Sequence, residues 1–204
     1  MKRLSITCAL LLVSVGLLAT AATAAPVART ASTRLPSLEG EVLAQLNKTR
    51  VERGLRPLVA SDSLQSASVL HSTAMLTGGF FQHESADGSP FSDRVKRFYP
   101  VAGFQTWTVG ENLLYSSGEI TAEAVIQAWL DSPGHRRNLL SPAWREVGVG
   151  AFEAASAGGT FGGSQTLVVT MDFGARSGGT SVAAATKHVK KKRVQRVLPL
   201  PSTS

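Results

Sequence analysis

Apolar residues recur with helical spacing in the first part of the chain. One helix is predicted from Leu38 to about Gly54, because apolar side chains return every three or four residues and a glycine ends the run. A second is predicted to follow a cap at Ser61/Asp62 and to stop at Gly78-Gly79. A histidine shares the apolar face of this second helix, and we expect it to be hydrogen-bonded in the core or at a cleft edge rather than to bind metal. The face comprises Leu64, Ala67, His71, Ala74 and Met75.

Two shorter helices are predicted further along. Ser89-Pro90 has the pattern of a capping residue before a proline at the first helical position, and predicts a helix that ends near Phe98. Thr121 predicts another cap, followed by an apolar stripe that stops at Pro133-Gly134. The stripe indicates that this helix packs against a core on one side only, and it consists of Ala122, Val125, Ile126 and Trp129.

The pattern changes to a period of two in the last third of the chain. Residues 147–151 and 167–173 alternate apolar and other side chains, and the stretch between them is rich in glycine and serine, which predicts an antiparallel hairpin. A further strand is predicted between Phe104 and Val109. Helices before and between a few antiparallel strands predict an α+β domain over residues 38–176.

The N-terminus has the pattern of an export signal. Lys2 and Arg3 precede an apolar run from Leu4 to Leu18, and small residues close it at positions 22–24. The run of about 15 residues is shorter than the roughly 20 that span a bilayer. We therefore predict a signal peptide over residues 1–24, cleaved after Ala24, and a secreted, extracellular protein. Residues 25–37 are predicted to be a flexible leader.

Composition narrows the class of protein. The chain has 204 residues, of which 43% are hydrophobic, and this suits one globular domain with appendages. Its one cysteine, Cys8, lies in the predicted signal, so no disulfide is expected in the mature chain and a bacterial source is favoured. We expect a monomer.

The positive charge of the chain collects at its ends. The formal net charge is +7. Two basic residues, Lys2 and Arg3, lie in the predicted signal, and six more lie in Lys187–Arg196. The segment between them is therefore close to neutral. A nucleic-acid-binding domain is therefore not expected, because phosphate binding needs basic residues clustered on the fold itself. Residues 177–204 are predicted to be a disordered basic tail. Two roles are open for this tail. It contacts an anionic surface, in which case the protein is associated with the cell surface, or it only adds solubility.

Three polar groups lie in apolar or glycine-rich surroundings, in the segments 80–83, 110–113 and 132–140. The usual local signatures of serine hydrolases, zincins and nucleotide-binding enzymes are absent from the sequence. The segments contribute His83, Glu111-Asn112, and His135 with Asn138. We expect Glu111 and Asn112 to lie between a strand and a loop.

These segments, in their order along the chain, resemble the CAP superfamily (SCP/PR-1-like domains), in its bacterial secreted branch. The resemblance rests on Leu46-Asn47 with Arg50, Gly54-Leu55, Pro57-Leu58, His71 with Met75, His83, Gly110-Glu111-Asn112, Ala128-Trp129, Ser132 to Arg136 with Asn138, Val147 to Gly150 and Asp172-Phe173-Gly174. It implies an α-β-α sandwich with a small antiparallel sheet, and a cleft lined by two histidines and two acidic residues. His83, Glu111 and His135 match three of the four. Ser132 stands where the second acid is expected, and Asp131 beside it is expected to point elsewhere.

Two imidazoles and a carboxylate in one cleft suit a zinc-like divalent metal ion, with His83, Glu111 and His135 as ligands. The same residues allow metal-free chemistry, in which Glu111 orients a histidine that acts as a general base. They also allow a purely structural role, with the polar side chains satisfying backbone groups. Asn112, Asn138 and His71 are expected around the cleft.

The leading functional hypothesis is a module that binds an extracellular ligand or protein through the cleft, without established catalysis. The alternatives are an extracellular metal-dependent hydrolase of the protease type and, third, a lipid- or sterol-binding protein. As a hydrolase the chain lacks an evident nucleophile, because Ser85 and Ser132 are nearby only in sequence.

Overall fold

The computed structural model describes residues 31–179 of the chain. The predicted signal peptide, Cys8 and the basic segment Lys187–Arg196 lie outside this range. The helices are α1 (Pro36–Val51), α2 (Asp62–Gly78), α3 (Phe91–Phe98), α4 (Ala122–Asp131) and α5 (Pro133–Leu140). The strands are β1 (Thr33–Arg34), β2 (Val59–Ala60), β3 (Thr106–Ser116), β4 (Glu146–Ala157) and β5 (Ser164–Ser177), and a 3-10 turn covers Gly159–Phe161.

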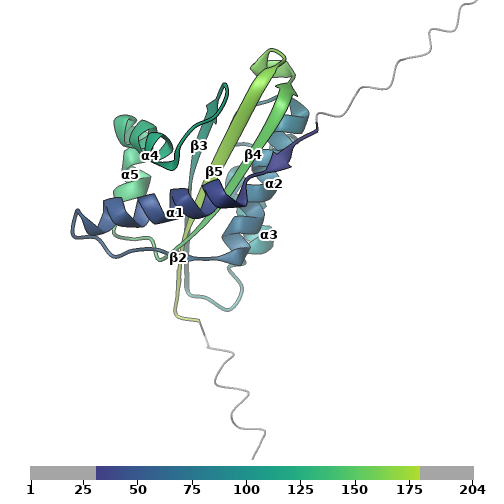
Figure 1. Cartoon of the computed structure of the whole chain (residues 1–204). Coiled ribbons are helices and arrows are strands. Elements are labelled where there is room, and N and C mark those ends of the chain that lie inside the picture. The colour runs from purple at the N-terminus through teal and green to yellow at the C-terminus, as the bar shows by residue number, and fades with distance from the viewer. Residues whose placement is uncertain (1–30, 180–204) are drawn as a thin grey trace, which may run out of the picture.

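A five-stranded sheet lies between two layers of helices, which confirms the predicted α+β class and the α-β-α arrangement (Figure 1). The strand order is β1-β4-β5-β3, with β2 alongside β4. The three long strands pair antiparallel, and β3 forms an edge of the sheet. Helices α1, α4 and α5 cover one face and α2 and α3 cover the other (Figure 1).

Successive side chains of β5 point to opposite faces of the sheet. Leu167, Val169, Met171 and Phe173 face the core shared with α1 and α4. Val168 faces the second core with α2, and the positions that follow it on the same face are polar, Thr170 and Asp172, both fully buried. A buried threonine and aspartate under α2 need hydrogen-bond partners, which this helix supplies.

Helix α2 lies unusually close to the sheet. A Cβ atom added to Gly148 of β4 would meet the backbone nitrogen of Gln65 at 2.1 Å, and one added to Gly150 would meet that of Val69 at 2.5 Å. The serines of α2 hydrogen-bond to the same two residues: Ser68 Oγ lies 3.2 Å from the Gly148 carbonyl oxygen, and Ser72 Oγ lies 2.8 Å from that of Gly150. Small residues on both elements therefore set the separation between helix and sheet.

Several boundaries differ from the sequence prediction. Thr33–Arg34 pairs with β4, and α1 begins at Pro36, so part of the predicted leader belongs to the fold. The Arg34 guanidinium makes two hydrogen bonds to the buried carboxylate of Glu39, at 2.9 and 2.8 Å, which ties this segment to α1. A pairing between residues more than a hundred positions apart gives no local signal.

The capping of two helices also differs. Ser89 is not the cap of α3, because Pro90 precedes its first turn and the Ser89 hydroxyl donates to Asp87 Oδ1 at 2.6 Å. Pro133 ends the pattern of α4 as predicted, but it also begins α5, since a proline is tolerated in the first helical turn. Thr121 caps α4 as predicted, accepting a hydrogen bond from the Ala124 amide at 3.3 Å.

The strand predicted between Phe104 and Val109 is longer than its pattern indicates. It continues to Ser116, so Glu111 and Asn112 lie inside β3 rather than between a strand and a loop. Polar residues at these two positions interrupted the alternation that marks a strand. Within residues 31–179, the structure has no helix with the length and apolar character needed to cross a membrane.

Candidate functional site

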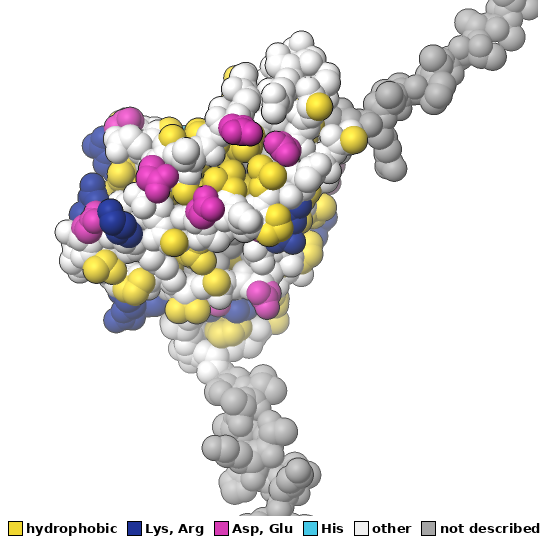
Figure 2. All heavy atoms as spheres, viewed as in Figure 1, with side chains coloured by type: hydrophobic (Ala, Val, Ile, Leu, Met, Phe, Trp, Pro, Cys, Tyr) yellow, Lys and Arg dark blue, Asp and Glu magenta, His cyan; other side chains and the backbone are white. Residues whose placement is uncertain are grey.

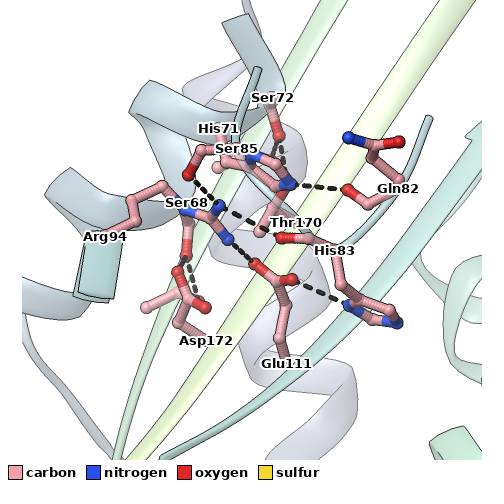
Figure 3. Close-up of polar contacts among 12 residues, drawn as sticks. Ser68, His71, Ser72, Gln82, His83, Ser85, Arg94, Glu111, Thr170 and Asp172 are labelled. Carbon is pink, nitrogen blue, oxygen red and sulfur yellow. Dashed lines mark hydrogen bonds and ion pairs between the residues drawn. The ribbon is translucent and has the colours of Figure 1, made fainter. Parts of the chain in front are cut away.

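Glu111 is the centre of a buried polar network beneath α2 and α3 (Figure 3). Its Oε1 lies 2.8 Å from His83 Nδ1, and its Oε2 is paired with the guanidinium of Arg94. The Glu111 side chain is completely buried. A buried carboxylate is costly without partners, so the two contacts account for its presence inside the fold.

His83 lies in the loop between α2 and α3, and the sequence prediction that it approaches Glu111 agrees with this geometry. Its side chain is 48% exposed, whereas that of Glu111 is not exposed at all. The hydrogen bond to Glu111 raises the pKa of His83, and burial opposes this increase. Because Nδ1 faces the carboxylate, the Nε2 atom is the one that points away from the network (Figure 3).

Arg94 of α3 connects the loop to the strand. Its NH2 group pairs with Glu111, and its NH1 group donates to the His83 carbonyl oxygen and to Ser85 Oγ, both at 3.2 Å. The residue is 2% exposed. One guanidinium therefore fixes both the backbone that carries His83 and the carboxylate that orients its ring.

Asp172 is a second buried carboxyl group, directly opposite Glu111 in the register of β3 and β5. Its Oδ2 accepts a hydrogen bond from Ser68 Oγ at 2.8 Å, and its Oδ1 has no partner within residues 31–179. Burial first, and then the negative charge of Glu111, raises the pKa of Asp172 well above its usual range. The environment thus favours the protonated form of Asp172 next to an ion-paired Glu111.

His71 of α2 is buried, 1% exposed, as the sequence predicted for a core or cleft-edge histidine. Its Nε2 lies 2.9 Å from the carbonyl oxygen of Gln82, so this nitrogen carries the proton and donates. Burial lowers the pKa of His71 to about 4. The ring therefore anchors the loop before His83 as a neutral group.

Acidification is expected to destabilise the wild-type protein more than a His71→Gln variant. His71 has a pKa of about 4 when folded and near 6.5 when exposed, so the unfolded state gains a proton first as the pH falls. Between pH 7 and pH 4, this difference in proton uptake lowers the free energy of unfolding of the wild type by about 3 kcal/mol. The variant lacks the histidine and does not have this loss. Urea titrations across this pH range measure the difference.

The comparison with the variant isolates His71, because two other groups act in the opposite direction. The pKa values of His83 and Asp172 are raised in the folded state, so their contributions favour the fold at low pH and are lost as the pH rises. Equal losses in the wild type and in His71→Gln would contradict the neutral, buried state of His71.

His135 lies in the first turn of α5, a helix that contacts the edge strand β3. Its imidazole is half-buried; burial lowers its pKa, and the charge of His83 lowers it further. Its carbonyl oxygen accepts a hydrogen bond from Asn112 Nδ2 at 3.1 Å. Asn138 donates to Asn112 Oδ1 at 2.9 Å and to the Glu111 carbonyl oxygen at 3.0 Å. The two asparagines therefore hold α5 against β3.

The geometry separates the roles of the three expected metal ligands. The two oxygens of Glu111 each have one partner, Arg94 or His83, and the side chain is completely buried. Across residues 31–179, no group of three or more His, Cys, Asp and Glu side chains is arranged to hold one. Glu111 instead has the position of a carboxylate that orients a histidine from behind, as in many metal sites. Unlike the Glu111 side chain, the imidazoles of His83 and His135 are partly exposed.

Ser132 and Asp131 contribute no fourth acidic group. Ser132 joins α4 to α5, and its carbonyl oxygen accepts a hydrogen bond from the Arg136 amide at 2.8 Å. Asp131 Oδ1 accepts from Gln127 Nε2 at 2.9 Å on its own helix, so its carboxylate points elsewhere, as predicted.

Sequence reasoning did not identify Arg94, Asp172 and Ser68 as members of the site. One signal was present for Asp172, a charged residue inside an apolar strand, where an ionisable group is rarely buried without partners. Arg94 gave none, because arginines on short helices are usually exposed.

Comparison with known proteins identifies the family. The family model described as the cysteine-rich secretory protein family, CAP, matches residues 43–173. The chain belongs to the CAP family. The match includes both residues of the Glu111–Asp172 pair and all three candidate residues, His83, Glu111 and His135. The family name refers to cysteines, yet this member has one, at position 8.

The relatives of this CAP protein include bacterial proteins. The protein YkwD of Bacillus subtilis is 35% identical over 127 residues, which is 62% of this chain and 47% of that protein. The membrane protein YlbC of the same organism is 30% identical over 112 residues, 55% of this chain and 31% of that protein. The chain thus matches less than half the length of either relative.

Solved structures agree with the fold. An extracellular protein containing an SCP domain from Bacillus anthracis has a TM-score of 0.52 at 25% identity, covering 68% of this chain and 40% of that one. An outer surface protein from Borrelia burgdorferi has a TM-score of 0.56 at 18% identity, covering 72% and 99%. The second likeness concerns the fold alone.

Proposed function

We propose that this CAP protein is an extracellular binding module whose ligand contacts the imidazoles of His83 and His135 beside edge strand β3. The observation that carries the proposal is the fixed orientation of His83. Glu111, itself held by Arg94, binds Nδ1 and leaves Nε2 directed away from the buried network (Figure 3). Orienting a half-exposed imidazole through a fully buried ion pair prepares it for a contact outside the fold.

The imidazoles of His83 and His135 suit a divalent metal ion of the zinc type, with the buried Glu111 carboxylate behind His83. Neutral imidazole nitrogen is a ligand of Zn²⁺, and the carboxylate behind His83 fixes the tautomer with Nε2 free to coordinate. Such an ion would leave positions open for a ligand of the module and would supply Lewis acidity there. The proposed extracellular location agrees with the structural neighbours, an extracellular protein from Bacillus anthracis and an outer surface protein from Borrelia burgdorferi.

The two alternatives have less support from the described residues. For a hydrolase, no serine or threonine hydroxyl within residues 31–179 is hydrogen-bonded to the imidazole of His83 or His135, and Ser85 Oγ accepts from Arg94 instead. For lipid or sterol binding at the His83 site, the pocket beside the network, lined in part by Leu70, His71 and Ala74, has about 230 Å³. Sites for drug-sized molecules typically have about 300–1,000 Å³.

Zinc titration of the purified chain tests the proposal. We expect binding of one Zn²⁺ per chain with a rise in the melting temperature, because an ion that binds only the folded state stabilises it. His83→Ala and His135→Ala are each expected to weaken the affinity at least tenfold, measured by calorimetry. His188→Ala is the matched control, because it removes the one histidine outside residues 31–179 and should leave the affinity unchanged.

Two results would contradict the metal-binding part of the proposal. One is the absence of zinc binding at pH 8, where His83 is deprotonated more fully than at neutral pH. The other is binding that survives both substitutions at His83 and His135. Loss of binding in His188→Ala alone would place the ion in the C-terminal segment instead.

A further inference from the structure

A groove with an apolar floor lies on the face of the molecule away from the His83 site. It has a volume of about 410 Å³ and runs along the N-terminal part of α1. Its floor is formed by Leu35, Leu38, Ile120 and Leu167, which come from three different segments of the chain: the start of α1, the loop before α4, and β5. Leu167 is buried and the other three are half-buried, so the floor offers apolar surface to a further group.

Acidic side chains surround this floor. Glu41 of α1, Glu119 of the loop before α4, and Glu153 of β4 line the groove. None of the three makes a hydrogen bond or an ion pair to a side chain within residues 31–179. Figure 2 shows acidic side chains gathered around a hydrophobic patch on this face.

The basic residue at the groove does not neutralise these carboxylates. Arg34 lines the groove, but its guanidinium pairs with Glu39 through Nε and Nη2, and Glu39 is 4% exposed. The groove therefore keeps three carboxylates around an apolar floor, a combination that suits a segment with several cations and adjacent apolar side chains.

The chain contains one segment of this composition. Lys187–Leu200 carries Lys187, Lys190, Lys191, Lys192, Arg193 and Arg196, followed by Leu198 and Leu200. Its six cations are the main source of the net charge of +7, since the rest of the chain is nearly neutral apart from Lys2 and Arg3. The opposite charges of groove and segment favour their association.

The segment is long enough to reach the groove. Leu167 on the groove floor and Ser177 at the end of β5 are separated by ten residues of strand, about 33 Å at roughly 3.3 Å per residue. Lys187 follows Ser177 by another ten residues, and Leu200 by 23. Because an extended chain spans up to about 3.3–3.6 Å per residue, the cations and leucines of the segment cover the required distance.

We propose that the groove lined by Glu41, Glu119 and Glu153 binds the C-terminal segment Lys187–Leu200 of the same chain. The carboxylates pair with the lysines and arginines, and Leu198 and Leu200 cover the apolar floor. The contact is separate from the ligand face at His83 and His135, so it does not depend on the proposed function.

Paramagnetic broadening in the full chain tests this contact. A nitroxide is attached at Gln195→Cys in a Cys8→Ser background, so that the introduced cysteine is the only thiol. At 0.1 M salt we expect the amide signals of Glu119, Ile120 and Glu153 to lose most of their intensity. At 1 M salt the loss should fall several-fold, because salt screens the charge pairs.

Charge-neutral variants of the groove provide the decisive comparison. The triple substitution Glu41→Gln, Glu119→Gln, Glu153→Gln is expected to restore the signal of Ile120 to near its level without the nitroxide. Asp93→Asn on α3 is the matched control, because Asp93 is exposed and does not line the groove, and it should leave the broadening unchanged. Circular dichroism checks that each variant is folded.

Three results would overturn the proposal. Broadening that is uniform over the surface, or concentrated elsewhere, would exclude the groove as the site of the segment. Broadening that survives the triple substitution would exclude the three carboxylates. Broadening seen in ¹⁵N-labelled chain without nitroxide, mixed with unlabelled spin-labelled chain, would assign the groove to the segment of a second copy.

Discussion

Replacing Arg94 with methionine is expected to lower the free energy of unfolding by about 3–5 kcal/mol, the cost of removing one partner from a buried ion pair. The substitution leaves the fully buried Glu111 with His83 as its remaining partner. It also removes the two hydrogen bonds from NH1 to the His83 carbonyl oxygen and Ser85 Oγ. Urea unfolding at pH 7 measures the loss.

Two further variants test whether the loss of stability comes from the broken Arg94–Glu111 ion pair or from replacing an arginine of α3 in general. Arg97→Met on the same helix is the matched control, because Arg97 is exposed, and it should change stability by no more than about 0.5 kcal/mol. Adding Glu111→Gln to Arg94→Met should restore part of the loss, since it removes the uncompensated carboxylate. A double variant no more stable than the sum of the single effects would contradict the ion-pair explanation.

The second large effect is expected at the contact between α2 and β4. Gly148→Ala should cost about 3 kcal/mol or more, because the added Cβ would lie 2.1 Å from the backbone nitrogen of Gln65 and 2.2 Å from the carbonyl carbon of Leu64. Backbone atoms of a helix cannot turn aside as a flexible side chain can. Relief therefore requires α2 to shift, which also moves Ser68 away from Asp172.

Thermal and urea unfolding of Gly148→Ala measure this effect. Gly40→Ala is the matched control: Gly40 lies within α1 and a Cβ there meets no atom within 4 Å, so the change should stabilise the helix by about 0.5–1 kcal/mol. Equal stabilities of Gly148→Ala and the wild type would show that α2 does not lie at the distance described. Any loss of stability by Gly40→Ala would show that factors other than close approach dominate.

The helices and the hairpin were predictable because their signals are local. The repeat of apolar residues in α1, α2 and α4 and the alternation in β4 and β5 report which face of each element is buried, whatever it packs against. The ends were predicted less well. The N-terminal strand at Thr33–Arg34 was missed because it is defined by its partner in β4, far away in the sequence.

The candidate site, like the fold, was predictable from the sequence only in part. His83, Glu111 and His135 could be selected from the sequence, because polar residues in apolar or glycine-rich surroundings stand out and their order resembles the CAP pattern. The roles of these three residues could not be predicted from the sequence. The sequence left Glu111 open as a metal ligand, as a group that orients a histidine or as a structural group, and the structure pairs it with His83 and Arg94. The part played by Arg94 depends on how α3 is placed above β3.

By itself the sequence determined the class of fold, the order of the helices and main strands, and the residues from which a site could be built. Those properties depend on periodicity and residue type, which are written along the chain. The tertiary structure decided which residues meet. The register of β3 against β5 places Glu111 opposite Asp172, and the close approach of α2 to Gly148 and Gly150 brings Ser68 to Asp172. Such contacts join residues 61 and 104 positions apart, and they follow from packing of whole elements rather than from any local pattern.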